Sequence, residues 1–84
     1  MNEKAILIEV IEILHRVDLQ KRNITENTLI FTELDFDSLQ MLELTETLQE
    51  RFGVNFLSDL LFFKDLRTPA SIATVIAHTK QNTS

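Results

Sequence analysis

Ser38, in the tripeptide Asp37-Ser38-Leu39, is the residue of this sequence best placed to do chemistry. A hydroxyl at a helix start lies beside unpaired backbone N–H groups and the positive end of the helix dipole, which favour a phosphate-type group. The two histidines, His15 and His78, are far from Ser38 in the sequence, and the Gly-x-Ser-x-Gly motif of serine hydrolases is absent. We therefore expect a serine that other proteins modify rather than a catalytic nucleophile.

The helix that must carry Ser38 is the best marked one, and we expect it from Asp37 to Phe52. Asp37 with Gln40 three residues later forms a capping-box pattern, and Gly53 is a typical C-terminal stop. Apolar residues at helical spacing form one stripe that we expect to face the core: Met41, Leu44, Leu48 and Phe52.

The rest of the chain predicts an all-α four-helix bundle with a long first loop and a short third helix. We expect a first helix from Asn2 to Val17, with Asn2 as its N-cap. Its inward positions are Ile6, Leu7, Val10, Ile11, Ile13, Leu14 and Val17. A long connection from Asp18 to Phe36 follows, and loops of this length are usually functional. We expect four apolar residues to pin it to the bundle: Ile24, Leu29, Phe31 and Leu34.

The last third of the sequence predicts the two remaining helices. A short one is expected at Ser58–Phe62, capped by Ser58. Thr68 is a suitable N-cap for the final helix, because Pro69 then stands at the first position, where a missing N–H costs nothing. Its inward face comprises Ile72, Val75, Ile76 and Thr79. Residues 80–84 are expected to be a flexible polar tail.

Composition supports one small domain spanning residues 1–84. The chain is 44% hydrophobic with one glycine and one proline, which favours helices over a turn-rich β-sandwich. Cysteine is absent, which excludes disulfides and thiolate metal sites, and no His spacing suggests a metal ligand set. The N-terminus does not resemble a signal peptide, and no apolar run approaches the ~20 residues of a membrane span. We expect a cytoplasmic monomer.

Charge is concentrated around Ser38. The net charge of −5 makes nucleic acid a poor partner, and it also disfavours an anionic membrane surface. All eight basic residues lie outside the window from Asn23 to Glu50, which holds seven acids: Glu26, Glu33, Asp35, Asp37, Glu43, Glu46 and Glu50. Exposed acids are usually only a solvated face. A face this one-sided also speeds encounter with basic partners, and Leu39 and Leu42 on its flank would add an apolar anchor.

These residues resemble the acyl carrier protein family. Glu33-Leu34-Asp35-Phe36-Asp37-Ser38-Leu39 is similar to the family motif D-L-G-x-D-S-L, with Glu33 for its first aspartate and Asp35 for its glycine. The likeness continues through the acidic second helix and into Leu66-Arg67-Thr68-Pro69-Ala70-Ser71-Ile72-Ala73, so it spans nearly the whole chain. The segment from Phe56 to Thr68 looks more like carriers of polyketide or nonribosomal peptide pathways than like those of primary fatty acid synthesis.

The resemblance implies a cofactor and a set of partners. Ser38 would receive 4′-phosphopantetheine covalently from coenzyme A through a phosphopantetheinyl transferase, with Asp37 and Leu39 beside it. The arm would carry acyl groups as thioesters to loading, condensing and tailoring enzymes with basic docking surfaces, and the carrier itself would perform no catalysis. The docking face for these enzymes would comprise Leu39, Leu42, Glu43, Glu46 and Glu50. We expect a specialised fatty acid or polyketide pathway.

Two alternatives stay open at this point. The same arm would serve an aminoacyl or peptidyl carrier of a nonribosomal peptide-type pathway. The chain could also be an unmodified acidic helical adaptor, because serine is common at helix starts for capping reasons alone.

Overall fold

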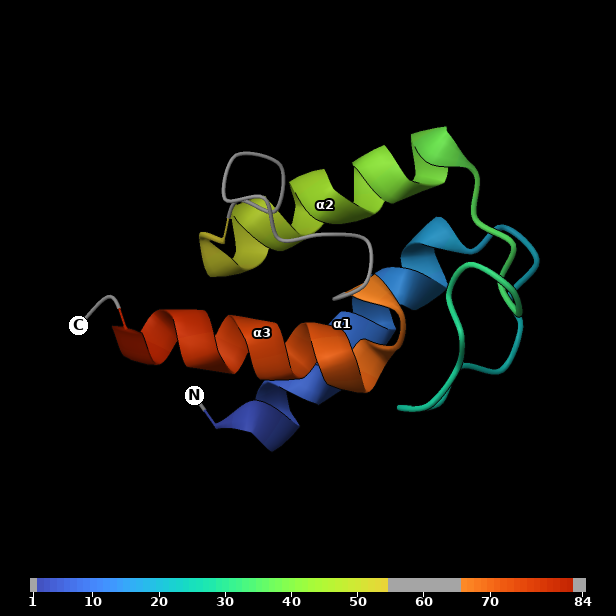
Figure 1. The fold of residues 1–84 in the computed structure, drawn as a ribbon. Helices are drawn as coiled ribbons and strands as arrows, with labels where there is room; N and C mark the ends of the chain where they lie inside the picture. Colours follow the sequence, from blue (N-terminus) through green and yellow to red (C-terminus); the bar gives the residue numbers. More distant parts are fainter. Residues whose placement is uncertain (1, 55–65, 83–84) are drawn as a thin grey trace.

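The chain is all-α in the part that the structure describes. The computed structural model describes residues 2–54 and 66–82, without the side chains of residues 80–82. These residues form three helices and no strand: α1 (Glu3–Val17), α2 (Ser38–Phe52) and α3 (Pro69–Asn82) (Figure 1). The all-α prediction is confirmed. The short helix expected at Ser58–Phe62 lies outside the described residues.

The first helix is the centre of the packing. It contacts both α2 and α3, and its contact with α3 is the more extensive (Figure 1). Each helix places its expected apolar stripe in the core, and Leu7, Ile11 and Val75 pack at its edge. The residues that the three helices contribute to the hydrophobic core are Ile6, Val10, Ile13, Leu14, Val17, Met41, Leu44, Leu48, Phe52, Ile72, Ala73 and Ile76.

Local capping explains where the helices begin and end. The Asn2 side-chain oxygen accepts a hydrogen bond from the Ala5 N–H at 2.8 Å, as expected of an N-cap. Thr68 caps α3 in the same way, since its hydroxyl accepts from the Ser71 N–H at 3.0 Å. At the end of α2, Gly53 adopts a left-handed conformation with φ of 74°, which glycine enters without steric cost.

The long connection between α1 and α2 is anchored differently from our prediction. Ile24 and Leu34 are buried as expected, but Leu29 and Phe31 are each 38% exposed, so their role as buried anchors was wrongly predicted. Ile30 is fully buried instead. Its backbone N–H donates to the Arg67 carbonyl at 2.9 Å, which fixes the turn and directs this side chain inward.

The last helix is longer than expected. It runs through Asn82, so residues 80–82, which we assigned to a polar tail, are helical. Neither glycine nor proline occurs at these positions, so the sequence holds no strong stop signal for the helix there. Residues 83–84 lie outside the described residues. None of the described helices combines the length and the apolar character that a bilayer crossing requires.

Candidate functional site

Ser38 is the first residue of α2, and its side chain is exposed. The helix start is held by a complete capping box. The Asp37 carboxylate accepts from the Gln40 N–H at 2.8 Å, and the Asp37 N–H donates to the Gln40 side-chain oxygen at 3.1 Å. Ser38 is therefore presented on a defined first turn rather than on a loose loop end.

The same capping box joins two helices. The Gln40 side-chain nitrogen donates to the Val17 carbonyl at 3.3 Å, which ties the start of α2 to the end of α1. The Val17 carbonyl is one of the last four of α1, which have no partner within their own helix. One side chain thus satisfies groups at both helix ends.

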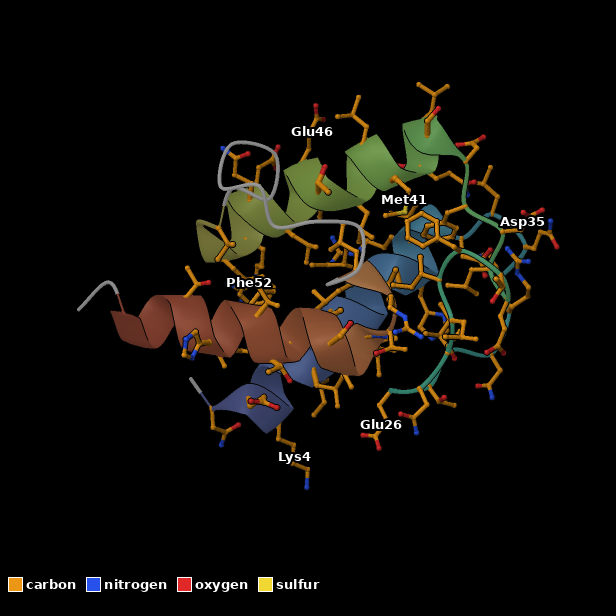
Figure 2. The ribbon with its side chains drawn as sticks, in the orientation of Figure 1. Lys4, Glu26, Asp35, Met41, Glu46 and Phe52 are labelled. Atoms are coloured by element: carbon orange, nitrogen blue, oxygen red, sulfur yellow. The ribbon has the colours of Figure 1, made fainter. Side chains whose placement is uncertain are left out.

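The turn before Ser38 takes a backbone conformation that glycine usually supplies. Asp35 has φ of 52°, in the left-handed region where Asp and Asn are the most tolerant residues after glycine. Asp35 lies on the connection just before α2 (Figure 2). Glu33, two residues earlier, closes its own turn, since its carboxylate accepts from the Leu29 N–H at 3.0 Å. Asp35 thus adopts the conformation that a glycine would take at this position.

The acidic flank of α2 is exposed as the sequence indicated. Leu39 is 75% and Leu42 is 42% exposed. The acids Glu43, Glu46 and Glu50 are also exposed, and Figure 2 shows Glu46 on the side of α2 away from α3. These five residues follow one another at helical spacing, so they form one continuous surface beginning next to Ser38. We call this surface the acidic flank.

An apolar groove lies beside Ser38. Its volume is about 470 Å³, and it runs between the connection and the first turns of α2. Its lining residues are Phe31, Phe36, Asp37, Ser38, Met41, Leu42 and Thr45. The sequence identified Met41 as a core residue but could not locate this groove, because its walls come from two segments whose relative position is set by the fold. The two histidines are exposed on α1 and α3.

A buried acid near the site was also missed. Asp18 is only 1% exposed, and its carboxylate pairs with the Arg22 guanidinium at 2.9 Å. The hydrogen bonds from the Arg22 side chain lower the pKa of Asp18 below its usual value, against the effect of burial, and the N–H groups of Arg22 and Gln20 add to the lowering. An Asp four residues before an Arg was the available signal, but it could not show burial.

Comparison with known proteins gives one result that bears on this site. The model of the family described as phosphopantetheine attachment site matches residues 4–76, a span that includes all of α2 with Ser38 and all of α1 except Glu3. No curated protein and no solved structure matches the chain. Proteins of the matched family carry covalently attached 4′-phosphopantetheine. Because the match covers most of the sequence, the chain belongs to the phosphopantetheine attachment-site family of carrier proteins.

Proposed function

We propose that Ser38 is the attachment residue and that the protein is an acyl carrier. The observation that carries this proposal is an exposed serine hydroxyl at the capped start of α2, inside the family match. The first N–H groups of a helix and its dipole favour a phosphate at that position. The site therefore fits a phosphodiester, and Asp37 fits a role in holding the turn that presents it.

The attachment reaction is a phosphoryl-type transfer with coenzyme A as the co-substrate. The Ser38 oxygen forms a bond to the phosphorus next to the pantetheine unit, while the pyrophosphate bond of coenzyme A breaks. Adenosine 3′,5′-bisphosphate leaves, and the hydroxyl proton passes to a base of the transferase. When bound, the arm supplies a thiol that this cysteine-free chain lacks, and the thiol can hold an acyl group as a thioester.

The acidic flank is our proposed docking surface for partner enzymes. It begins one residue after Ser38, which places any bound enzyme close to the attachment point. Its acids favour basic partners by electrostatic steering, and Leu39 offers a 75% exposed apolar contact. A transferase and the acyl-loading, condensing and tailoring enzymes would share this surface.

The groove supports an acyl cargo over an aminoacyl one. Phe31, Phe36 and Met41 give it a mainly apolar lining, and it lies directly against Ser38. An apolar chain gains from leaving water, whereas a charged amino group would lose hydration there. We place the protein in a specialised fatty acid or polyketide pathway.

Intact-mass measurement tests the proposal. The protein is incubated with coenzyme A and a phosphopantetheinyl transferase of broad specificity. We expect wild type to gain the mass of one phosphopantetheine unit and Ser38→Ala to gain nothing. An unmodified adaptor would show no gain in either protein, and a gain that persists in Ser38→Ala would place the attachment elsewhere.

A further inference from the structure

The Asp18–Arg22 pair lies outside the proposed attachment and docking surfaces, at the C-terminal end of α1. Asp18 is the C-cap of that helix, and its carboxylate accepts from the backbone N–H groups of Arg22 at 2.8 Å and Gln20 at 3.2 Å. The Arg22 guanidinium adds a hydrogen bond at 2.9 Å. Both oxygens of the buried carboxylate thus accept hydrogen bonds, and the carboxylate orients the planar guanidinium fork of Arg22.

The other face of that fork reaches the segment that precedes Ser38. Nη1 of Arg22 donates to the Glu33 carbonyl at 3.1 Å, and Nη2 donates to the Leu34 carbonyl. Both carbonyls come just before Asp35, the residue with the left-handed backbone. One arginine therefore connects the end of α1 to the turn that leads into the attachment site.

A second link reaches the other side of Ser38. Gln40 donates to the Val17 carbonyl at 3.3 Å, and Val17 is the neighbour of Asp18. Residues 34 and 40 are therefore both tied to the same end of α1, and Ser38 lies on the short stretch between them. We call this stretch, residues 35–39, the bridge, because the residues at both of its ends are hydrogen-bonded to the same region of the fold.

The backbone around the pair supports this interpretation. Lys21 has φ of 53°, an unfavourable value for a lysine, and its N–H donates to the Asp18 carbonyl at 3.2 Å. Such conformations persist where surrounding contacts determine them. The tight turn at Lys21 brings Arg22 back over Asp18, which is the position from which it reaches Leu34.

We propose that Asp18 and Arg22 are positioning residues that hold the bridge around Ser38 in the conformation that a phosphopantetheinyl transferase recognises. This inference rests on the proposed function of Ser38. Neither residue touches the reacting hydroxyl. They keep most molecules in the conformation that the transferase recognises, which we call the competent conformation. If only a fraction of the molecules is competent, the apparent KM equals the intrinsic KM divided by that fraction.

Steady-state kinetics of modification test the proposal, with the carrier as the varied substrate. Arg22→Gln removes the charge and the fork. Arg51→Gln is the matched control, because it changes the net charge by the same amount. It also breaks an ion pair with α1, since Arg51, near the C-terminal end of α2, pairs with Glu9 of α1. Both variants are assayed at a temperature where circular dichroism shows them folded.

We expect the KM of Arg22→Gln to rise about tenfold, which corresponds to a competent fraction of about one tenth, while kcat stays near wild type. Arg51→Gln should keep both constants. Arg22→Lys should give an intermediate KM, because an ammonium group pairs with Asp18 but lacks the planar fork that also serves the carbonyls. A wild-type KM for folded Arg22→Gln overturns the proposal, and so does an equal rise in Arg51→Gln.

One further variant and the behaviour of wild type separate this inference from other causes of failure. If Arg22→Gln does not fold, Asp18→Asn decides, since it keeps the shape of the side chain and removes the charge that orients the arginine. A raised KM in Asp18→Asn supports the proposal and an unchanged KM rejects it. If wild type is not modified at all, the proposed function of Ser38 fails, whereas modification of wild type and Arg22→Gln with equal KM rejects only the positioning role.

Discussion

Leu48 gives the sharpest test of how α2 packs. Its side chain is 0% exposed and lies in the core shared with α1. Leu48→Ala removes about three methylene-sized groups, worth about 2.4 kcal/mol at about 0.8 kcal/mol each. The cavity left behind adds to this loss, so we expect a decrease of about 2–5 kcal/mol in the free energy of unfolding. A domain of 84 residues has a total of roughly 4–13 kcal/mol, so this change is large.

Urea unfolding followed by circular dichroism measures the change, with Leu39→Ala as the control. Leu39 is on the same helix and is 75% exposed, so the same substitution should alter the free energy of unfolding by about 0.5 kcal/mol or less. If the free energy of unfolding falls with urea concentration at the same slope in wild type and both variants, all three proteins expose the same surface on unfolding. A shift for Leu48→Ala no larger than that for Leu39→Ala would refute the assigned core face.

Three other predictions address charge and backbone. Glu43→Lys combined with Glu46→Lys should slow modification by the transferase about tenfold or more at low salt, because both acids are exposed on the acidic flank. The circular dichroism spectrum should stay unchanged, and unchanged kinetics would contradict a docking role. Asp35→Gly should leave the free energy of unfolding within about 1 kcal/mol of wild type, and Asp35→Val should lower it more, since φ is 52°; equal denaturation midpoints for the two would oppose this. The pKa of Asp18 is lowered in the folded state. The stability that its carboxylate adds to the fold should therefore be complete above the unfolded-state pKa of about 4, and it should be lost as the pH falls through the folded-state pKa. The difference in unfolding free energy between wild type and Asp18→Asn should therefore narrow from pH ~7 to pH ~3, and a constant difference would argue against the shift.

The helix ends were predictable from sequence because they depend on nearby residues. Asp37 and Gln40 stand three positions apart, and their reciprocal hydrogen bonds form within one turn. Gly53 likewise ends α2 through its own backbone freedom. Such features need no information from the rest of the fold.

The connection shows where local reasoning stops. Leu29, Ile30 and Phe31 are consecutive apolar residues, and composition does not distinguish them. The structure buries Ile30, whose N–H donates to the carbonyl of Arg67 in the segment just before α3. That contact joins segments distant in the sequence, so no local pattern could select the buried residue.

The sequence by itself determined that Ser38 begins an amphipathic helix and that acids line its exposed flank, since helical periodicity alone assigns residues to faces. Only the tertiary structure decided that Asp18 is buried, that Arg22 reaches the carbonyls of Glu33 and Leu34, and that a groove opens beside Ser38. Burial and the direction of backbone carbonyls depend on how separate segments meet. The type and location of the site are therefore local properties, whereas its presentation is a property of the packed chain.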